Sequence, residues 1–176
     1  MEITDIIYIS FKMKWKVVYM LKIRRAVMKD INRIEELLYQ VHKVHSDERP
    51  DIFKEGMKKY TKEELEELIE NDEKPIFVSI DKNDRIVGYV FCIYQHTKGV
   101  QSLIDRKILF IDDFCVDSDE RGKNIGGQMY QFIEEEAKKN ECSSVILNVW
   151  NFNGGAMRFY EKLGFSALKT VMEKKL

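Results

Sequence analysis

The stretch "VDSDERGKNIGGQMY", residues 116–130, joins a glycine-rich loop to a segment with helical periodicity. The loop carries two basic side chains, Arg121 and Lys123, and glycines that let a backbone approach a ligand closely. Its backbone N–H groups and the positive end of the following helix dipole would together favour an anion. The two basic side chains would add charge-assisted donors. The stretch therefore predicts an anion-binding loop or, more simply, a flexible turn with a solvated charge pair.

Two common phosphate-binding motifs do not fit this loop. Gly122 and Gly127 have the spacing of a P-loop, but Gln128 and Met129 stand where that motif needs Lys and Ser or Thr. A dinucleotide-binding fingerprint needs its first glycine at the strand-to-helix turn and an acid at the end of the next strand. Here "DSDER" precedes Gly122, and the next strand ends near Asn148 without an acid. A diphosphate loop of another kind remains.

Strand-like and helix-like segments alternate around this loop. Thr61 and Glu64 form a capping-box pattern, and "DKND" separates two apolar, β-branched segments that predict a hairpin. The chain order predicts an α/β fold with a mixed β-sheet and helices on its faces. Apolar periodicity predicts helices over residues 30–44, 61–71, 126–140 and 153–164, strands over residues 21–26, 74–81, 85–95, 108–116 and 143–150, and a last strand within residues 165–176.

Length and composition set the domain organisation. The chain has 176 residues, only two prolines and no linker-like segment, which predicts a single domain over residues 20–176. Residues 1–19 are interpreted as an N-terminal extension, either a short extra strand or a non-native leader upstream of the natural start. A net charge of −1 gives no basic field for nucleic acid, and no apolar run is long enough for a membrane span.

The cysteines and histidines show no metal-binding pattern. Cys92, Cys115 and Cys142 are widely spaced, which predicts free thiols in a reducing, cytoplasmic environment. Cys115 has no histidine near it in the sequence and is not expected to act as a nucleophile. His42 and His45 lie one helical turn apart without evident partner ligands, so no metal is expected.

Two blocks of the sequence resemble the GNAT superfamily of N-acetyltransferases. The family pattern is Gln or Arg, any two residues, Gly, any one residue, and Gly or Ala. "RGKNIG", residues 121–126, fits this pattern with one departure, Asn124 in place of the usual glycine at the fourth position. Asparagine tolerates left-handed backbone better than most other residues. "NFNGGAMRFYEKLGF", residues 151–165, resembles the second family block. The resemblance extends over about residues 21–176.

The resemblance implies a GNAT-like fold, whose central twisted mixed sheet splays between strands 4 and 5, and acetyl-CoA as co-substrate. The glycine loop would bind the CoA diphosphate, and the open edge of the fourth strand would bind the pantetheine arm. Asn153 stands at the family's usual further contact to that arm. The implied cofactor-binding residues are Phe114, Cys115, Val116, Arg121, Gly122, Lys123, Asn124, Ile125, Gly126, Gly127, Asn153, Ala156 and Tyr160.

Acetyl transfer to a primary amine needs a base and an acid. An alkyl amine with a pKa of about 10 is mostly protonated at neutral pH and cannot attack. Asp112 and Asp113 would point to opposite faces of a regular strand, so at most one of them faces the acceptor unless a bulge redirects the other. The resemblance favours Asp112 as base, acting through water, and Tyr160 as the acid that protonates the thiolate. Alternatively, either aspartate only binds a cationic acceptor or solvates the sheet, and Tyr160 is a core residue.

The acceptor is the least defined part of the prediction. Acidic residues around "IDDF" suit a small cationic amine such as a polyamine, and peptide amines and aminoglycosides stay open as acceptors. In the family, residues matching 42–56 and 94–107 shape the acceptor pocket, and homodimers are common. The alternative function is a non-catalytic acyl-CoA-binding regulatory module, which would keep the diphosphate loop without needing Tyr160 or a strand aspartate.

Overall fold

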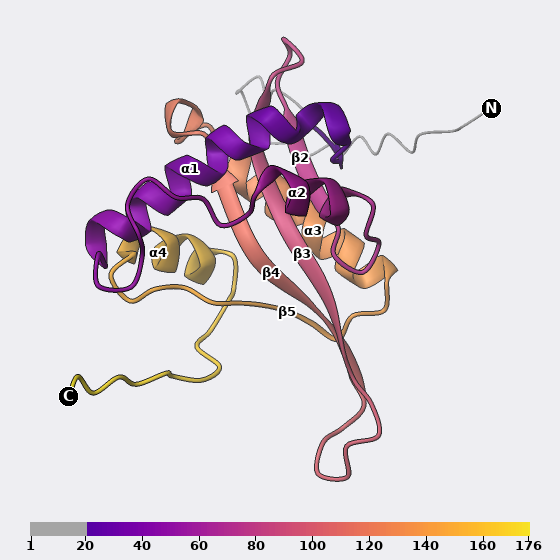
Figure 1. The fold of residues 1–176 in the computed structure, drawn as a ribbon. Helices are drawn as coiled ribbons and strands as arrows, with labels where there is room; N and C mark the ends of the chain where they lie inside the picture. The colour runs from indigo at the N-terminus through magenta and orange to yellow at the C-terminus, as the bar shows by residue number, and fades with distance from the viewer. Residues whose placement is uncertain (1–20) are drawn as a thin grey trace.

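The computed structural model describes residues 21–176, so the expected N-terminal extension lies outside the described residues. Five strands form one sheet in the order β1-β2-β3-β4-β5 (Figure 1). Neighbouring strands are antiparallel up to β4, whereas β5 runs parallel to β4, which confirms the predicted mixed sheet. The strands are β1 (Lys22–Arg25), β2 (Ile76–Ile80), β3 (Ile86–Thr97), β4 (Arg106–Val116) and β5 (Ser144–Leu147).

Helices cover both faces of the sheet. In Figure 1, α1 (Ile31–Glu48) and α2 (Lys62–Ile69) lie on the near face, and α3 (Ile125–Lys139) lies behind it. The last helix, α4 (Gly154–Lys162), lies to one side, near the C-terminal end of α1. Each face has its own apolar cluster, with Ile34, Leu37 and Leu65 on the α1 and α2 side and Met129, Phe132 and Ile133 on the α3 side.

Local sequence signals fix the starts of two helices as predicted. Thr61 Oγ1 accepts a hydrogen bond from the Glu64 N–H, and Glu64 Oε2 accepts one from the Thr61 N–H, so the capping box forms at α2. Asn153 Oδ1 accepts a hydrogen bond from the Ala156 N–H and caps α4. The predicted hairpin between β2 and β3 is also present.

β4 and β5 diverge after a short paired segment. Ile108–Ile111 of β4 pair with Ser144–Leu147 of β5, and residues 112–116 continue β4 without a partner on that side. The splay expected between strands 4 and 5 is therefore present. It leaves backbone donors and acceptors of the C-terminal half of β4 open.

A β-bulge lies where the splay begins. Phe91 of β3 is opposite Asp113, and Cys92 is opposite Ile111, so Asp112 is an extra residue on β4. Such a bulge bends the strand and redirects its side chains. The simple alternation that would place Asp112 and Asp113 on opposite faces does not hold here.

The strand predicted within residues 165–176 is wrong: the described chain has no strand after α4. A sheet strand buries alternate side chains, but Val171 and Met172 are 85% and 90% exposed. Glu173 instead forms an ion pair with Arg49 in the loop after α1. Without a neighbouring strand, the backbone of this tail has no ladder to join.

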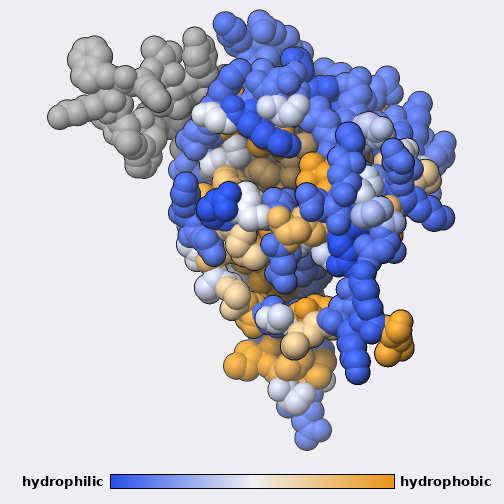
Figure 2. Space-filling view, turned by 90° about the vertical axis from the view of Figure 1, so that its left-hand side faces the viewer, coloured by the Kyte–Doolittle hydropathy of each residue, from blue (hydrophilic) through white to orange (hydrophobic). Residues whose placement is uncertain are grey.

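Figure 2 views this side of the molecule, where hydrophobic residues gather in the lower half of a mainly hydrophilic face.

The segment at residues 94–107 also differs from its expected place at the acceptor pocket. It comprises the end of β3, the tip of the β3–β4 hairpin at residues 98–105 and the start of β4, and this hairpin projects from the end of the sheet farthest from α1 (Figure 1). Phe91 is opposite Asp113, and at roughly 3.3 Å per residue Thr97 lies about 20 Å further along β3. The hairpin tip is therefore remote from the strand aspartates.

Candidate active site

The glycine loop enters α3 through residues with positive φ. After a 3-10 turn, η2 (Ser118–Glu120), Gly122 has φ of 78° and Asn124 has φ of 60°. Asn124 thus adopts the left-handed conformation expected of a residue that replaces glycine. Its side chain lies against the first turn of α3, close to Gly127. A Cβ on Gly127 would lie only 2.5 Å from Asn124 Oδ1, so a larger residue at position 127 would collide with this side chain.

The backbone of this loop presents unpaired donors. The N–H groups of residues 122–127 donate no hydrogen bond to any other described residue, and the next N–H, that of Gln128, donates to the Asn124 carbonyl. Unpaired amides at a helix N-terminus, reinforced by the helix dipole, form an anion-binding site. Arg121 and Lys123 are exposed beside them. A diphosphate therefore fits the donors that the structure presents.

Substitutions at Asn124 test whether this residue adopts a left-handed backbone conformation. We expect Asn124→Val to lower the free energy of unfolding by about 1–2 kcal/mol relative to Asn124→Gly, because a β-branched residue is strained at positive φ. Urea unfolding of both variants measures the difference. Equal unfolding free energies would contradict the left-handed conformation of residue 124.

The open edge of β4 offers backbone groups rather than a reactive thiol. Cys115 is buried, its Sγ donates to the Leu37 carbonyl at 3.7 Å, and burial raises its pKa to about 12. The thiol is therefore protonated and is not a nucleophile. The Val116 carbonyl accepts a hydrogen bond from Arg121 Nε at 3.3 Å, which joins this edge to the glycine loop.

Asp112 already holds a primary ammonium. Its Oδ2 lies 2.8 Å from Lys59 Nζ, which also donates to the Asp112 carbonyl at 2.8 Å. The Tyr60 hydroxyl donates to the same Oδ2, and its ring stacks on Phe91 at 5.3 Å between centroids. Both Lys59 and Tyr60 come from the loop between α1 and α2. A small pocket with a mainly apolar lining borders this group of residues.

Asp113 has a different electrostatic environment. Burial raises its pKa to about 6; the charge of Lys59 opposes this rise, and that of Asp112 adds to it. At neutral pH its carboxylate is ionised yet more basic than an ordinary aspartate. A carboxylate with a pKa near the working pH is suited to general-base chemistry.

Tyr160 lies on α4 beside the open end of β4. Its ring contacts Phe114 of β4 and Phe165, with centroids 6.4 and 5.5 Å away. Burial and, secondarily, the charge of Asp113 raise the pKa of Tyr160 well above its ordinary value. The hydroxyl is therefore protonated at neutral pH, and it forms no hydrogen bond with another described residue. It can donate a proton to a substrate.

Several residues predicted to bind the cofactor hold the site together. Ile125 is 6% exposed and packs in the core on the α3 side. A Cβ on Gly126 would lie 3.1 Å from the Phe159 ring, so glycine permits the close approach of α3 to α4. Asn153 and Ala156 form the cap of α4. At Ile125 only the backbone N–H remains available to a ligand.

A cluster of aromatic side chains, formed by His45, Phe53 and Trp150, lies beside the site on the side where β5 has diverged. His45 of α1 and Phe53 of the following loop lie 5.1 Å apart, and Phe53 contacts Trp150 at 5.5 Å between ring centroids. The Arg49 guanidinium lies 5.9 Å from the Trp150 ring. The loop expected to shape the acceptor pocket, residues 42–56, thus meets the connection between β5 and α4.

No local pattern in the sequence indicates Lys59 or Tyr60 as site residues. Lys59 reaches Asp112 across 53 positions of the chain, and Tyr60 directly precedes the helix cap at Thr61. Both contacts depend on how the loop between α1 and α2 crosses β4. The described residues contain no group of three or more His, Cys, Asp or Glu that could hold a metal ion. Nor does this part of the chain include a helix long and apolar enough to cross a membrane.

Comparison with known proteins identifies the family. The model of the acetyltransferase (GNAT) family matches residues 38–165, and the chain belongs to this family. It is 29% identical over 149 residues to an uncharacterized N-acetyltransferase of Methanocaldococcus jannaschii, a match that covers 85% of this chain and 62% of that relative. A probable N-acetyltransferase of Drosophila melanogaster is 33% identical over 89 residues, which are 50% of this chain and 45% of that protein. The chain thus spans less than two thirds of either relative.

Solved structures share the fold. A tetramutant of the BH1408 protein from Bacillus halodurans superposes with a TM-score of 0.85 at 30% identity, covering 88% of this chain and 99% of that one. An aminoglycoside acetyltransferase from an uncultured soil metagenomic sample, solved with sisomicin, has a TM-score of 0.66 at 18% identity, covering 89% and 95% of the two chains. At that identity the likeness shows the fold alone.

Proposed function

We propose that the protein transfers an acetyl group from acetyl-CoA to a primary amine by direct attack of the amine on the thioester. One observation carries the proposal: the unpaired loop amides, the open edge of β4, the carboxylate of Asp113 and the hydroxyl of Tyr160 occur together where β5 diverges. Membership of the GNAT family supports the same reaction.

In this proposal the backbone binds most of the co-substrate. The amides of residues 122–127 bind the CoA diphosphate, with Arg121 and Lys123 as further donors. The backbone groups of residues 112–116 that have no partner in the protein pair with the amides of the pantetheine arm, and an N–H group of this edge stabilises the oxyanion formed from the thioester. The Asp112 and Val116 carbonyls are not among these groups, because they accept from Lys59 and Arg121. This assignment requires no metal ion.

Asp113 is the base and Tyr160 the acid of the proposed reaction. Asp113 takes a proton from the acceptor ammonium and passes it to water, and the free amine then forms a C–N bond to the acetyl carbon. As the C–S bond breaks, the Tyr160 hydroxyl protonates the departing CoA thiolate. The nitrogen gives up its second proton to leave the neutral amide, and this proton restores the Tyr160 hydroxyl through water, so that one proton is released in total. The resemblance to the family favours Asp112 as base, but its carboxylate is occupied by Lys59 and Tyr60. We therefore assign Asp112 to binding the acceptor ammonium.

The contact between Lys59 and Asp112 supports a cationic acceptor. The site already accommodates one primary ammonium at 2.8 Å from a carboxylate oxygen, beside a second carboxylate. A small polyamine-like amine or the amine of a peptide could replace Lys59 there. The aminoglycoside acetyltransferase of the same fold adds amino sugars to the acceptors worth testing. Free thiols at all three cysteines support a reducing compartment such as the cytoplasm.

Removal of Lys59 should improve acceptor binding if its ammonium competes with that of the substrate. We expect Lys59→Met to lower the KM of the amine up to about fivefold, because a partly exposed ion pair contributes up to about 1 kcal/mol. Lys58→Met is the matched control, since Lys58 pairs with Glu35 on α1 instead. Steady-state kinetics with varied amine measures both. An unchanged or raised KM in Lys59→Met would contradict the competition.

A transfer assay tests the proposed function. The protein is incubated with acetyl-CoA and, separately, spermidine, a lysine-containing peptide and an aminoglycoside; mass spectrometry detects acetylated product, and a thiol reagent detects released CoA. Calorimetric titration with acetyl-CoA, with ATP and NAD as controls, measures binding independently. Acetyl-CoA binding without transfer to any amine would favour the non-catalytic module. Failure to bind acetyl-CoA would overturn the assignment.

A further inference from the structure

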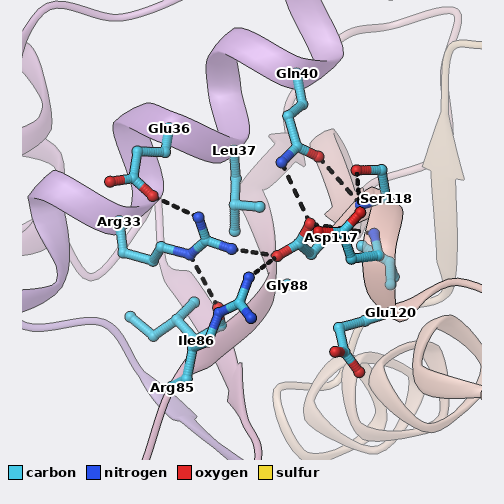
Figure 3. Close-up of polar contacts among 12 residues, drawn as sticks. Arg33, Glu36, Leu37, Gln40, Arg85, Ile86, Gly88, Asp117, Ser118 and Glu120 are labelled. Carbon is cyan, nitrogen blue, oxygen red and sulfur yellow. Dashed lines mark hydrogen bonds and ion pairs between the residues drawn. The ribbon is translucent and has the colours of Figure 1, made fainter.

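A buried carboxylate lies at the junction between β4 and the glycine loop. Asp117 is 1% exposed and is the first residue after β4. Arg33 and Gln40 reach it from α1, and Arg85 reaches it from the turn between β2 and β3 (Figure 3). Arg85 donates to Asp117 Oδ2 at 2.6 Å, and Gln40 donates to Oδ1 at 3.3 Å. We refer to these four residues as the Asp117 clamp.

The clamp also fixes the backbone that enters the loop. The Asp117 N–H donates to the Val87 carbonyl at 2.9 Å. The Ser118 N–H donates to Gln40 Oε1 at 3.1 Å, and the Asp119 N–H donates to Asp117 Oδ1 at 3.4 Å. Residues 117–119 are therefore tied to α1 and to β3. The amides that follow, from residue 122 to residue 127, have no partner among the described residues.

The arginines of the clamp do not themselves offer a site for an anion. The guanidinium groups of Arg33 and Arg85 both donate to Asp117 Oδ2, and Arg33 also pairs with Glu36 and donates to the Ile86 carbonyl. Burial raises the pKa of Asp117, but its hydrogen bonds and the two arginines outweigh burial and hold that pKa below its ordinary value. An ionised carboxylate removed from water needs such partners to be stable. The group is therefore a fixed anchor.

We propose that Asp117 is a positioning residue for the diphosphate of CoA, acting through the backbone of the glycine loop and not by contact with the ligand. Anchoring residues 117–119 orders the start of the loop before binding, so less conformational entropy is lost when the free amides bind the diphosphate. The inference rests on the proposed function in taking CoA as the ligand. It extends that function because it proposes that Asp117, a residue outside the glycine motif, keeps the loop ordered.

Two acetyl donors separate positioning from general damage. Acetyl-pantetheine lacks the diphosphate and nucleotide of acetyl-CoA, so it cannot report on the loop. We expect Asp117→Asn to raise the KM of acetyl-CoA about tenfold, as the loss of about 1.4 kcal/mol would do. The KM of acetyl-pantetheine, and kcat at saturating acetyl-CoA, should change less than about twofold. Replacement of a residue that is important only for the fold would change the KM of both donors by the same factor.

Asp30 provides the matched control. It is 3% exposed and paired with Arg24, whose Nη1 and Nη2 lie 2.6 and 3.0 Å from its two oxygens. Asp30 precedes α1 and its partner is on β1, at the edge of the sheet opposite β5. Asp30→Asn removes a buried carboxylate of similar environment and should leave the ratio of the two KM values at its wild-type value.

Milder variants keep the test decisive if Asp117→Asn does not fold. Arg85 is half-exposed in a turn, and Arg85→Gln should raise the KM of acetyl-CoA selectively but by a smaller factor. An equal rise in the KM of acetyl-CoA and of acetyl-pantetheine in these variants would overturn the proposal. Equal KM values of the two donors in the wild-type protein would also overturn it. If the protein acetylates no amine, the proposed function fails, and the dissociation constants of CoA and pantetheine, measured by calorimetry, test the clamp in the same way.

Discussion

Replacement of Tyr160 by phenylalanine is expected to lower kcat for acetyl transfer by about 10²–10⁴-fold, the contribution of a positioned general acid. The hydroxyl is protonated at neutral pH because burial and the charge of Asp113 raise its pKa. It has no hydrogen-bond partner among the described residues, so its removal leaves no orphaned group in the protein. The ring contacts to Phe114 and Phe165 are kept.

The dissociation constant of acetyl-CoA is expected to stay nearly constant in Tyr160→Phe, which distinguishes loss of chemistry from loss of binding. Tyr130→Phe is the matched control: Tyr130 lies on α3 and its ring also contacts Phe165, at 5.2 Å between centroids. Calorimetry and steady-state kinetics of both variants measure the separation. A Tyr160→Phe variant with wild-type kcat would mean that water or another group protonates the thiolate.

The features that sequence analysis predicted correctly are mostly local. A capping box at Thr61, a cap at Asn153 and a left-handed residue at Asn124 each involve side chains within about one turn of the backbone they affect. The strand assigned to residues 165–176 failed because a strand also needs a neighbour, which apolar composition does not specify. A strand exists only as part of a ladder.

The chemistry of the two aspartates depends on contacts that periodicity does not encode. The bulge at Asp112 cancels the alternation on which the sequence argument relied. Lys59 comes to Asp112 from a separate loop, and Arg33 comes to Asp117 across 84 positions. Each of these contacts follows from the packing of α1 and its loop onto β4. The glycine motif thus indicates where a candidate site lies, while tertiary packing determines the electrostatics of the residues around it.

Replacement of Asp113 by asparagine is the variant expected to affect rate and pH dependence together. In the wild type, kcat/KM should fall as pH decreases through about 6, because the base must be ionised and the pKa of Asp113 is about 6. Asp113→Asn should lose about 10²–10⁴-fold in kcat/KM near neutral pH. The residual activity should show no transition near pH 6 and should rise only as the acceptor ammonium loses its proton at higher pH.

Asp112→Asn is the control for the assignment of the base. If Asp112 binds the acceptor ammonium, this variant should raise the KM of the amine and retain the transition near pH 6. If the transition instead disappears in Asp112→Asn and persists in Asp113→Asn, Asp112 is the base, as the resemblance alone predicts. The pH profiles of kcat/KM for the two variants therefore decide between two adjacent residues.

The Asp113→Asn substitution that lowers activity should raise the free energy of unfolding at neutral pH. Its pKa is raised from 3.8 to about 6 by folding, so the folded state binds this proton more tightly than the unfolded state. The associated stability is fully present below about pH 4 and is lost as pH rises through about 6. Asp113→Asn removes the buried charge and should raise the free energy of unfolding at pH 7 by up to about 3 kcal/mol. Urea unfolding at pH 4 and 7 measures this, and an equal difference between variant and wild type at both pH values would contradict it.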